Sequence, residues 1–496
     1  MPVDKDSVAY YNGKVHTLNN LGQVAEAFIV TLITYNLNGR FVMPGIHDAH
    51  VHLLSAGISY LSGVSLAGDT TVENIGQRLQ EGQCTCAYQH AFQDWVVGNT
   101  FAIPNFDRSS LDHDFPDTPV VILGGAGHSA FLNTTGLQKA GYDVDNEPDF
   151  KGAKFGRRAD GSLTGELAEL AMNKVMLSKG NPNITHAKRA IKAAIRRLHQ
   201  VGVTSCQEAA TNTIILNALR EMDEENALHM DIAAHSILLD GVPLPPMFSS
   251  AGLDDEGNIE KDKILVDDVI EAVKRFDERG LTVKIHATGR GSTRLALDAI
   301  EAARQGNENS RTGSIVKHEI AHCNGIHPDD FERFQKQNIT AELSPAMFFD
   351  HPLTQASNGA MNWDFAQLLK ARAYPITIGS DWGSRGDPSL LNKVHHVVRR
   401  VGDWAVNNSA IAVQENSNTP VSLGARLVLE ILTNNGATAV GLSDKNGSIE
   451  VGKRANFIML DRDVVSDNEE VVADFENVKV LKTWFEGELV WDAEAE

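Results

Sequence analysis

The sequence is poor in cysteine and lacks any long apolar run, and each shortage excludes a class of protein. Its four cysteines are Cys84, Cys86, Cys206 and Cys323. Although Cys84 and Cys86 stand close together, no second cysteine pair follows them, so we expect reduced thiols rather than a cysteine metal site or a disulfide framework. No apolar segment is long enough to span a bilayer, so we expect no transmembrane helix.

Positive charge is also scarce, because 44 lysines and arginines stand against 65 aspartates and glutamates and leave a net charge of −21. Such a balance argues against nucleic acid or an anionic membrane surface as a partner. The segment Met1–Asp6 has neither a basic start nor an apolar core. We therefore expect no secretory signal and a cytoplasmic location. The contents of 42% hydrophobic and 22% charged residues fit a soluble globular protein with room for more than one domain.

The most informative stretch runs from Arg40 to His52 and ends in His-Val-His. Pro44 and Gly45 predict a turn, and the residues after them predict a short strand. Alternate residues of a strand face the same side, so His50 and His52 point the same way. Two imidazoles on one face can hold one divalent metal. Taken alone, the pair is equally compatible with surface or core histidines.

From Gly202 onward, strands and helices alternate. The predicted strands are Val203–Gln207, Met230–Leu239, Leu281–His286, Ile315–His322, Ile339–Leu343 and Ile376–Asp381. The predicted helices are Ile184–Gln200, Ile214–Glu225, Val266–Arg279, Thr293–Arg304, Pro328–Gln337 and Asn362–Arg372. Repeated strand–helix units of this size predict an α/β fold, either a closed (β/α)₈ TIM-like barrel or an open doubly wound sheet. No glycine-rich phosphate loop follows an early strand, which favours the barrel.

Five polar residues stand at the carboxyl ends of these strands. They are His50, His52, His286, His322 and Asp381. Active sites of barrels are built at that rim, so we expect four imidazoles and one carboxylate to converge there. Such ligands suit zinc and similar divalent metals, and zinc is the metal we favour. The ordinary alternative for Asp381 is the N-cap of a helix.

These ligands predict a hydrolytic reaction on a small-molecule substrate. A bound metal lowers the pKa of water from about 15.7 towards 7 and polarises a carbonyl. Asp381 would take the proton from water and deliver it to the leaving nitrogen. The predicted reaction is hydrolysis of an amide-like carbon–nitrogen bond.

Pro-Gly-Ile-His-Asp-Ala-His-Val-His at Pro44–His52 resembles the first-strand signature of the amidohydrolase superfamily. Further segments resemble the amidohydrolase 3 group, which includes the N-substituted formamide deformylase-like proteins. These segments are Trp95–Gly98, His128–Asn133, Leu163–Glu169, Gly202–Ser205 and Ser380–Trp382. The likeness runs from about Tyr11 to Trp491. It implies the same reaction class, a metal-dependent hydrolase of non-peptide carbon–nitrogen bonds.

The resemblance also implies a domain plan. Residues 1–46 and 440–496 would form a small composite β-sandwich from both termini. Residues 47–439 would form the hydrolase barrel, with an insertion at about 60–183 after the first barrel strand. The first segment is short for the group, so the sandwich is expected to lack a strand or two.

The chain departs from the group at one expected ligand. Relatives carry a Val-Lys-x-x-x-Asp-Gly strand whose lysine is taken to bridge two metals as a carboxylated side chain. Here the best register places Ser236 at the lysine, followed by Asp240 and Gly241. Met230–Leu239 also stands as one strand where relatives have two, so one βα unit is missing or fused. We therefore predict one tightly bound metal ion. A second ion stays possible if Lys284 is carboxylated and bridges the two ions.

Other polar residues are weaker candidates. His128, Trp382 and Arg385 are predicted to contact substrate, although His128 also suits a buried structural role and Arg385 a solvated one. Glu166 and Glu169 follow Ser162, and we place them at a helix start, where a capping role suits Glu166.

Two rival interpretations stay open at this stage. The first is a catalytically degenerate binding protein that keeps the amidohydrolase fold without the bridging lysine. The second is an incomplete gene product that folds poorly. The sequence does not specify the substrate, and it leaves open whether the chain forms a homo-oligomer.

Overall fold

The computed structural model describes residues 8–495 with internal gaps. The gaps are 20–21, 31–33, 62–63, 67–68, 83–91, 93, 101, 125–126, 235, 245–247, 307–316, 347–354, 356, 358–360, 362, 384–385, 408–419 and 466–474. Cys84, Cys86 and Arg385 therefore lie outside the described residues, and the predictions made for them stay untested.

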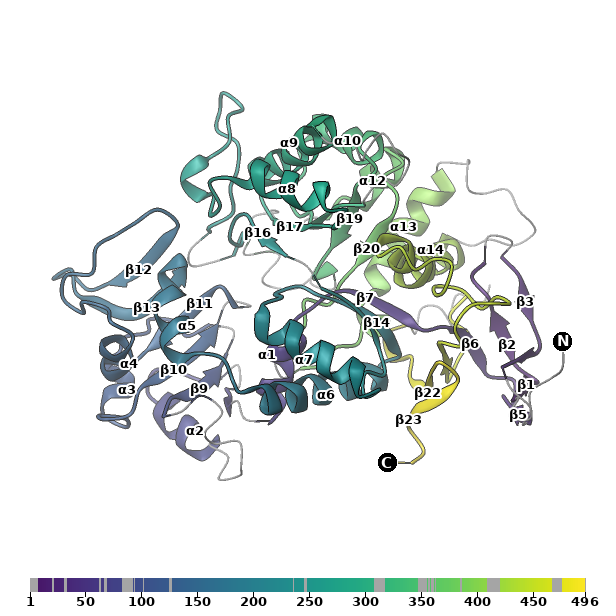
Figure 1. The fold of residues 1–496 in the computed structure, drawn as a ribbon, viewed down its shortest axis with the longest axis horizontal. Coiled ribbons are helices and arrows are strands. Elements are labelled where there is room, and N and C mark those ends of the chain that lie inside the picture. Colours follow the sequence, from purple (N-terminus) through teal and green to yellow (C-terminus); the bar gives the residue numbers. More distant parts are fainter. Residues whose placement is uncertain are drawn as a thin grey trace.

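Parallel strands form the centre of the molecule (Figure 1). One sheet has the order β15-β14-β7, from β15 (Asp231–Ala234), β14 (Val203–Glu208) and β7 (Ile46–Val51). The second has the order β16-β17-β18-β19-β20, from β16 (Ile237–Leu238), β17 (Lys284–Ala287), β18 (Glu319–His322), β19 (Thr340–Leu343) and β20 (Ile376–Ile378). All pairs are parallel, and a bridge between Val51 and Trp382 joins the two sheets.

The prediction of one strand over Met230–Leu239 is wrong, because the segment forms two short strands with different partners. Its first half, β15, pairs with β14 through Ser205 and Asp231. Its second half, β16, pairs with β17, where Ile237 lies beside Ile285. Only two residues separate β15 from β16, whereas at least one helix lies between any other two successive parallel strands. A local sequence pattern shows that a segment is extended but does not show where it changes partner.

Helices surround these strands on the outside. They include α1 (Leu53–Leu61), α6 (Ile184–Gln200), α7 (Thr213–Glu224), α8 (Val269–Glu278), α9 (Arg290–Gly306), α10 (Phe331–Lys336), α12 (Phe365–Lys370), α13 (His395–Asn407), α14 (Pro420–Glu430) and α15 (Gly436–Ala439). Helix α6 has the predicted bounds, and the Asn183 side chain accepts a hydrogen bond from His186 N as its N-cap. Its Ala187, Ile191 and Leu198 are fully buried, because they recur at helical spacing. Among the described residues, no helix is both long and apolar enough to cross a membrane.

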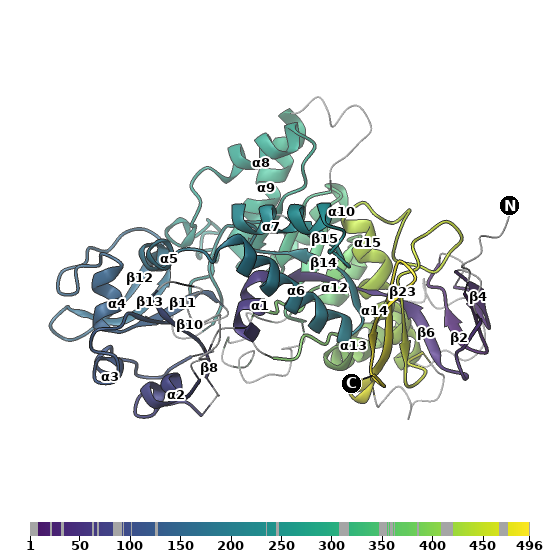
Figure 2. The ribbon, with the colours of Figure 1, turned by 60° about the horizontal axis from the view of Figure 1, so that its bottom comes forward.

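Residues 64–169 form a separate six-stranded sheet with the order β12-β13-β11-β10-β9-β8. Its strands are β8 (Val64–Ser65), β9 (Val96–Asn99), β10 (Val120–Gly124), β11 (Ser129–Leu132), β12 (Ala153–Arg157) and β13 (Leu163–Glu169). Helices α2 (Ile75–Gly82), α3 (Ser109–Asp112), α4 (Thr134–Lys139) and α5 (Asn173–Lys179) accompany it. Figures 1 and 2 place this unit on the side of the molecule opposite β1 to β6.

The structure corrects the helix start predicted around Glu166 and Glu169. Both residues lie on β13, which pairs with β11 and β12. Leu163, Gly165 and Leu167 are buried and alternate with the half-buried Thr164 and Glu166, which is the period of a strand.

Segments from both ends of the chain share one further sheet. Its order is β23-β22-β21-β6-β2-β3, from β2 (Lys14–His16), β3 (Val24–Ala25), β6 (Phe41–Pro44), β21 (Phe457–Leu460), β22 (Val480–Phe485) and β23 (Glu488–Asp492). A three-stranded sheet of β4 (Phe28–Ile29), β1 (Ala9–Tyr11) and β5 (Thr34–Asn36) lies beside it. The rings of Tyr10, Phe457 and Trp484 pack together between them. The predicted domain boundaries themselves stay a prediction.

Candidate metal centre

Three of the five predicted ligands lie in direct contact. The ligand atoms of His50, His52 and Asp381 all lie within 4.8 Å of one another. His52 Nε2 is 3.0 Å from Asp381 Oδ1, and His50 Nε2 is 3.6 Å from the same oxygen. His50 belongs to β7, and His52 follows it directly. These residues could hold one metal ion.

The other two predicted ligands continue this cluster. The ring centroid of His322 lies 4.6 Å from that of His50 and 4.4 Å from that of His286. His286 lies on β17 and His322 ends β18. The rings of His52, His50, His322 and His286 thus follow one another across the ends of the parallel strands. The structure brings all five predicted residues to one place.

The turn that carries Asp381 is fixed to β7 by hydrogen bonds. Asp48 accepts bonds from Ser380 N at 2.9 Å and from Ser380 Oγ at 2.6 Å. Asp381 N donates to His50 O at 2.8 Å. A side chain at Gly379 would place Cβ only 2.3 Å from the Cβ of His50, so glycine is required for this close approach. The sequence thus sets Asp381 beside the two histidines.

Further polar groups orient the imidazole rings. His50 Nδ1 lies 3.0 Å from Glu342 Oε2, and His322 Nδ1 lies 2.8 Å from the Ser344 carbonyl oxygen. Each contact leaves Nε2 as the nitrogen open to a ligand. Metal-bound histidines usually have such a partner on the other ring nitrogen.

Burial and neighbouring charges set the ionisation of these groups. Burial lowers the pKa of His50, and burial together with His286 and His50 lowers the pKa of His322 to about 3. Burial opposes ionisation of Glu342, yet Lys284 and His50 lower its pKa to about 2. For Asp381, likewise against burial, the hydrogen bond from His52 and the nearby His50 keep the pKa well below its usual range. Burial thus favours the neutral form of His50 and His322, whereas the hydrogen bond to Asp381 outweighs burial and raises the pKa of His52.

The residues fit a divalent metal by their own chemistry. Neutral imidazoles and a carboxylate are the ligands that zinc and related ions take. Within the part of the chain that the structure describes, both ring nitrogens of buried His286 lack a hydrogen-bond partner, although Nδ1 lies 3.3 Å from Asp240. Buried polar atoms without a partner are rare and need a reason, and a bound cation would provide one. His322 and Asp381 also have positive φ angles of 72° and 51°, which is strain of the kind that collects at functional sites.

The amino group of Lys284 is surrounded by protein oxygen atoms, an environment that differs from that of a bridging metal ligand. Its side chain is only 2% exposed, and Nζ donates hydrogen bonds to the Ala49 carbonyl oxygen and to Gln207 Oε1. Nζ also lies 3.4 Å from Glu319 Oε2 and 3.8 Å from Glu342 Oε2. The Lys284 amino group is therefore already engaged by oxygen atoms of its neighbours, and both glutamates near it are buried.

The position expected for the bridging lysine directly precedes β16, and by the two-residue period of a strand it would share a face with Leu238 and His286. Leu238 pairs side by side with His286, and Ser236 stands two residues before Leu238. Ser236 is exposed, and its hydroxyl is too short and too weakly acidic to bridge two cations. Asp240, four residues on, accepts hydrogen bonds from Thr288 N and Ser292 Oγ and so fixes the turn after β17.

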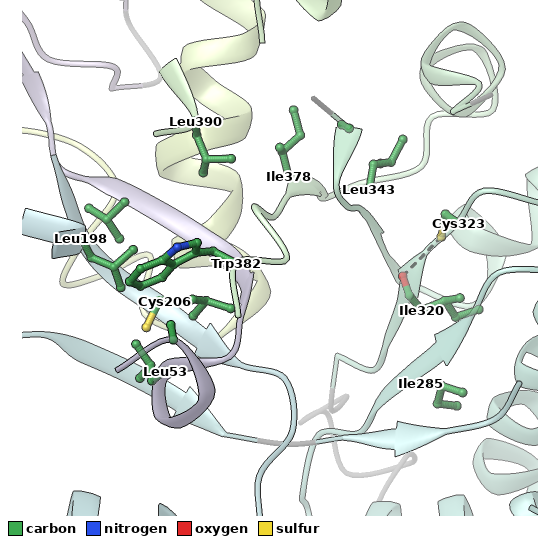
Figure 3. Packing of buried hydrophobic residues seen from close by; sticks show 14 of the residues in the cluster. Leu53, Leu198, Cys206, Ile285, Ile320, Cys323, Leu343, Ile378, Trp382 and Leu390 are labelled. Atoms are coloured by element: carbon green, nitrogen blue, oxygen red, sulfur yellow. Dashed lines mark hydrogen bonds between the residues drawn. The ribbon is translucent and has the colours of Figure 1, made fainter. Parts of the chain in front are cut away.

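The predicted substrate residues have separate outcomes. His128 lies beside the cluster, with its ring centroid 5.4 Å from that of His286. Its Nδ1 is 3.0 Å from Glu169 Oε2, and this hydrogen bond outweighs burial and raises the pKa of His128. Trp382 is 6% exposed and packs into the core near Leu53 (Figure 3). Trp382 therefore has a structural role in the core. Contact between Trp382 and the substrate stays a prediction.

Sequence reasoning missed the residues that hold the histidines. Glu342 was not singled out, although a glutamate inside the apolar run Ile339–Leu343 signals a buried charge with a partner. Glu169 was assigned to a helix start. Both residues act on histidines that are distant in sequence, so their partners are evident only in the folded chain.

Comparison with known proteins assigns the chain to a family. The sequence profile described as "Amidohydrolase family" matches residues 34–491. Protein LONG AFTER FAR-RED 3 of Arabidopsis thaliana is 24% identical, covering 92% of this chain and 84% of that protein. N-substituted formamide deformylase of Arthrobacter pascens is 22% identical, covering 98% and 95%. An uncharacterized metal-dependent hydrolase of Pyrococcus horikoshii shares the fold with a TM-score of 0.67 and 20% identity, covering 92% and 98%. The predicted resemblance is confirmed, and the chain belongs to the amidohydrolase family.

Proposed function

We propose that the protein is a metal-dependent hydrolase of a non-peptide carbon–nitrogen bond in a small N-acyl or N-formyl compound. Membership of the amidohydrolase family supports a hydrolase, and the bond type is our own proposal. The observation that carries it is the convergence of His50, His52 and Asp381 within 4.8 Å. The relative named as an N-substituted formamide deformylase supports the same bond type.

In this proposal His50, His52, His286, His322 and Asp381 hold the metal. A metal bound there would acidify a water molecule and polarise the acyl oxygen. Asp381 accepts a proton from the attacking water and returns it to the leaving nitrogen, so that water and amide give an acid and an amine. Glu342 holds the His50 ring, and His128 contacts the substrate. Trp382 and Arg385 are weaker candidates than His128 for contact with the substrate.

We further propose a single tightly bound ion, with zinc favoured. Two ions about 3.5–4 Å apart need an anionic ligand between them. Ser236 cannot supply it, and the hydrogen bonds of Lys284 Nζ to Ala49 and Gln207 leave that amino group engaged elsewhere. We therefore expect slow hydrolysis, or hydrolysis restricted to activated amides and small N-acyl groups.

The fold and its surroundings complete the proposal. We propose that the parallel strands close into a (β/α)₈ barrel whose third and fourth strands are the continuous segment Asp231–Leu238. Residues 1–46 and 440–496 would form the composite sandwich, and about 60–183 the insertion. Cys206 and Cys323 are free and buried, in keeping with the cytoplasmic location that we propose.

Metal analysis tests the assignment of the ligands. Wild-type protein purified without added metal should retain at least one divalent ion per chain. The double variant His50→Ala/His52→Ala should lose it while keeping a cooperative thermal transition. His229→Ala is a matched control, because this side chain is 47% exposed and far less constrained. Full metal content in the double variant would contradict the site.

A degenerate binding protein remains the second candidate, because Ser236 stands where relatives carry lysine. An assay of amine release from a panel of N-formyl and N-acyl compounds separates the two. Turnover that Asp381→Asn abolishes supports the enzyme. Tight metal without turnover of any member of the panel supports the binding protein.

A further inference from the structure

Glu169 has a backbone conformation that few residues other than glycine adopt. Its φ and ψ are 53° and −130° at the end of β13. Such a conformation is strained and persists only where the surroundings enforce it. Its side chain is 3% exposed, so both the strain and the burial of a carboxylate need an explanation.

The Glu169 carboxylate joins the inserted sheet to the parallel-strand core. Oε2 lies 3.0 Å from His128 Nδ1, and Glu169 N donates to the His128 carbonyl oxygen at 3.1 Å. Oε1 accepts a hydrogen bond of 2.6 Å from Ser249 Oγ. Ser249 follows β16 and belongs to the core, and its Oγ also accepts from Val242 N at 3.1 Å. Both carboxylate oxygens are therefore held, one from each side.

Gly241 makes the space for this carboxylate. A Cβ at Gly241 would lie 2.2 Å from Glu169 Oε1 and 2.1 Å from Ser249 Oγ. Both distances are too short for any side chain to coexist with the hydrogen bond. The two residues of the Asp-Gly pair after β16 thus have different roles. Asp240 fixes the turn beside His286, and the missing side chain of Gly241 leaves room for the Glu169 carboxylate.

The consequence concerns the ring of His128. Glu169 occupies Nδ1, so Nε2 is the nitrogen left for a ligand. The ring centroid lies 5.4 Å from that of His286, one of the five proposed metal ligands. The side chain of His128 is 16% exposed, so a small molecule bound at the cluster can reach it.

We propose that Glu169 is a positioning residue for substrate: it fixes the His128 ring so that Nε2 hydrogen-bonds the amide group of the substrate beside His286. The inference rests on the proposed hydrolase function for its substrate and on the contacts of Glu169 for its geometry. Glu169 acts through His128 and touches neither metal nor substrate.

A double-mutant cycle in the metal-loaded protein tests this role. Glu169→Ala and His128→Ala should each raise KM for an N-acyl substrate roughly tenfold, the order expected for one lost hydrogen bond. Metal content should not change. The double variant should be no worse than His128→Ala alone, because the two residues act as one unit. Glu169→Gln keeps an acceptor for Nδ1–H and should restore most of the loss. An undiminished effect of Glu169→Ala in the His128→Ala background would overturn the proposal.

Two further variants guard against misfolding as the cause. Gly241→Ala displaces the carboxylate without removing any polar group, and it should reproduce the rise in KM. Glu166→Gln changes another carboxylate of β13 and should keep the wild-type KM. A folded Gly241→Ala protein with wild-type KM, or an equal rise in Glu166→Gln, would contradict the proposal.

Nitrogen-15 spectra of histidine-labelled protein test the geometry without any substrate. His128→Asn identifies the His128 signals. In the metal-loaded wild type, Nδ1 of His128 should carry hydrogen, and Glu169→Ala should abolish that preference. Identical spectra would overturn the positioning role whether or not turnover is found. The expected spectra with no turnover would count against the proposed hydrolysis alone.

Discussion

The two sides of the parallel-strand region differ in construction. Strands β17 to β20 are buried at every residue, and β17, β18 and the turn after β20 carry His286, His322 and Asp381. On the other side, β15 is only half-buried throughout and Leu238 of β16 is 40% exposed. Two residues connect β15 to β16, where helices connect the other neighbours.

The difference bears directly on our proposal of a single metal ion. Every proposed ligand lies on β7, directly after it, or on the fully buried side. Glu342 and the Ser344 carbonyl oxygen hold the rings of His50 and His322, and Asp48 accepts hydrogen bonds from Ser380 beside Asp381. The one expected ligand that the chain lacks is the bridging lysine. Its position, taken by Ser236, lies between β15 and β16 on the less buried side. In our proposal, the lack of a lysine at that position leaves no bridge between two metals, whereas the ligands of a single ion stay in place.

The largest effect is expected from Asp381, on the buried side. Asp381→Asn keeps the shape but removes the base, so kcat should fall by about 10²–10⁴. Ser236→Ala on the shortened side should leave the rate near the wild-type value. Steady-state assays of any substrate found in the amide panel compare the two. Equal rates for Asp381→Asn and the wild type would remove Asp381 from the mechanism.

The next effect concerns stability and the buried cation under the site. Lys284→Met leaves Glu319 and Glu342 buried without their counter-charge and should destabilise the fold by about 3–5 kcal/mol. Lys151→Met breaks an exposed pair with Asp267 and should cost about 0–1 kcal/mol. Urea unfolding followed by circular dichroism measures both. Similar midpoints for the two variants would show that the Lys284 cluster is not a structural ion-pair network.

A matched pair of isoleucines compares the two sides directly. Ile285 and Ile237 are neighbours across the ladder of β17 and β16, yet Ile285 is fully buried and Ile237 only half-buried. Ile285→Ala should cost about 2–5 kcal/mol, and Ile237→Ala about 1 kcal/mol or less. Equal losses in urea unfolding would mean that β16 is as tightly packed as β17.

The smallest effect is a gain at the shortened side. Ser236→Lys with bicarbonate supplied should raise metal uptake towards a second ion, because by the two-residue period of a strand position 236 would share a face with Leu238 and His286. Leu238→Lys is a control for a lysine merely added nearby. No uptake by Ser236→Lys, or equal uptake by both variants, would refute the register from Ser236 to Asp240.

The convergence of the five candidate ligands could be predicted because each lies near or just after the end of a strand that its own sequence pattern defines. The split of Met230–Leu239 could not, since both halves are extended and only their partners differ. Glu342 and Glu169 depend on histidines that are 292 and 41 residues away in sequence. Glu169 was also assigned the wrong element, because a short polar segment after Ser162 gave no clear period until Leu163, Gly165 and Leu167 were seen to be buried in alternation.

The central claim is that the shortened chain keeps a single-metal site. Metal content per chain, measured by plasma mass spectrometry on protein purified without added metal, tests it most directly. The account predicts one tightly bound ion in the wild type and none in His50→Ala/His52→Ala. Two tightly bound ions in the wild type, still present in Lys284→Ala, would show that another residue bridges them and would contradict the account.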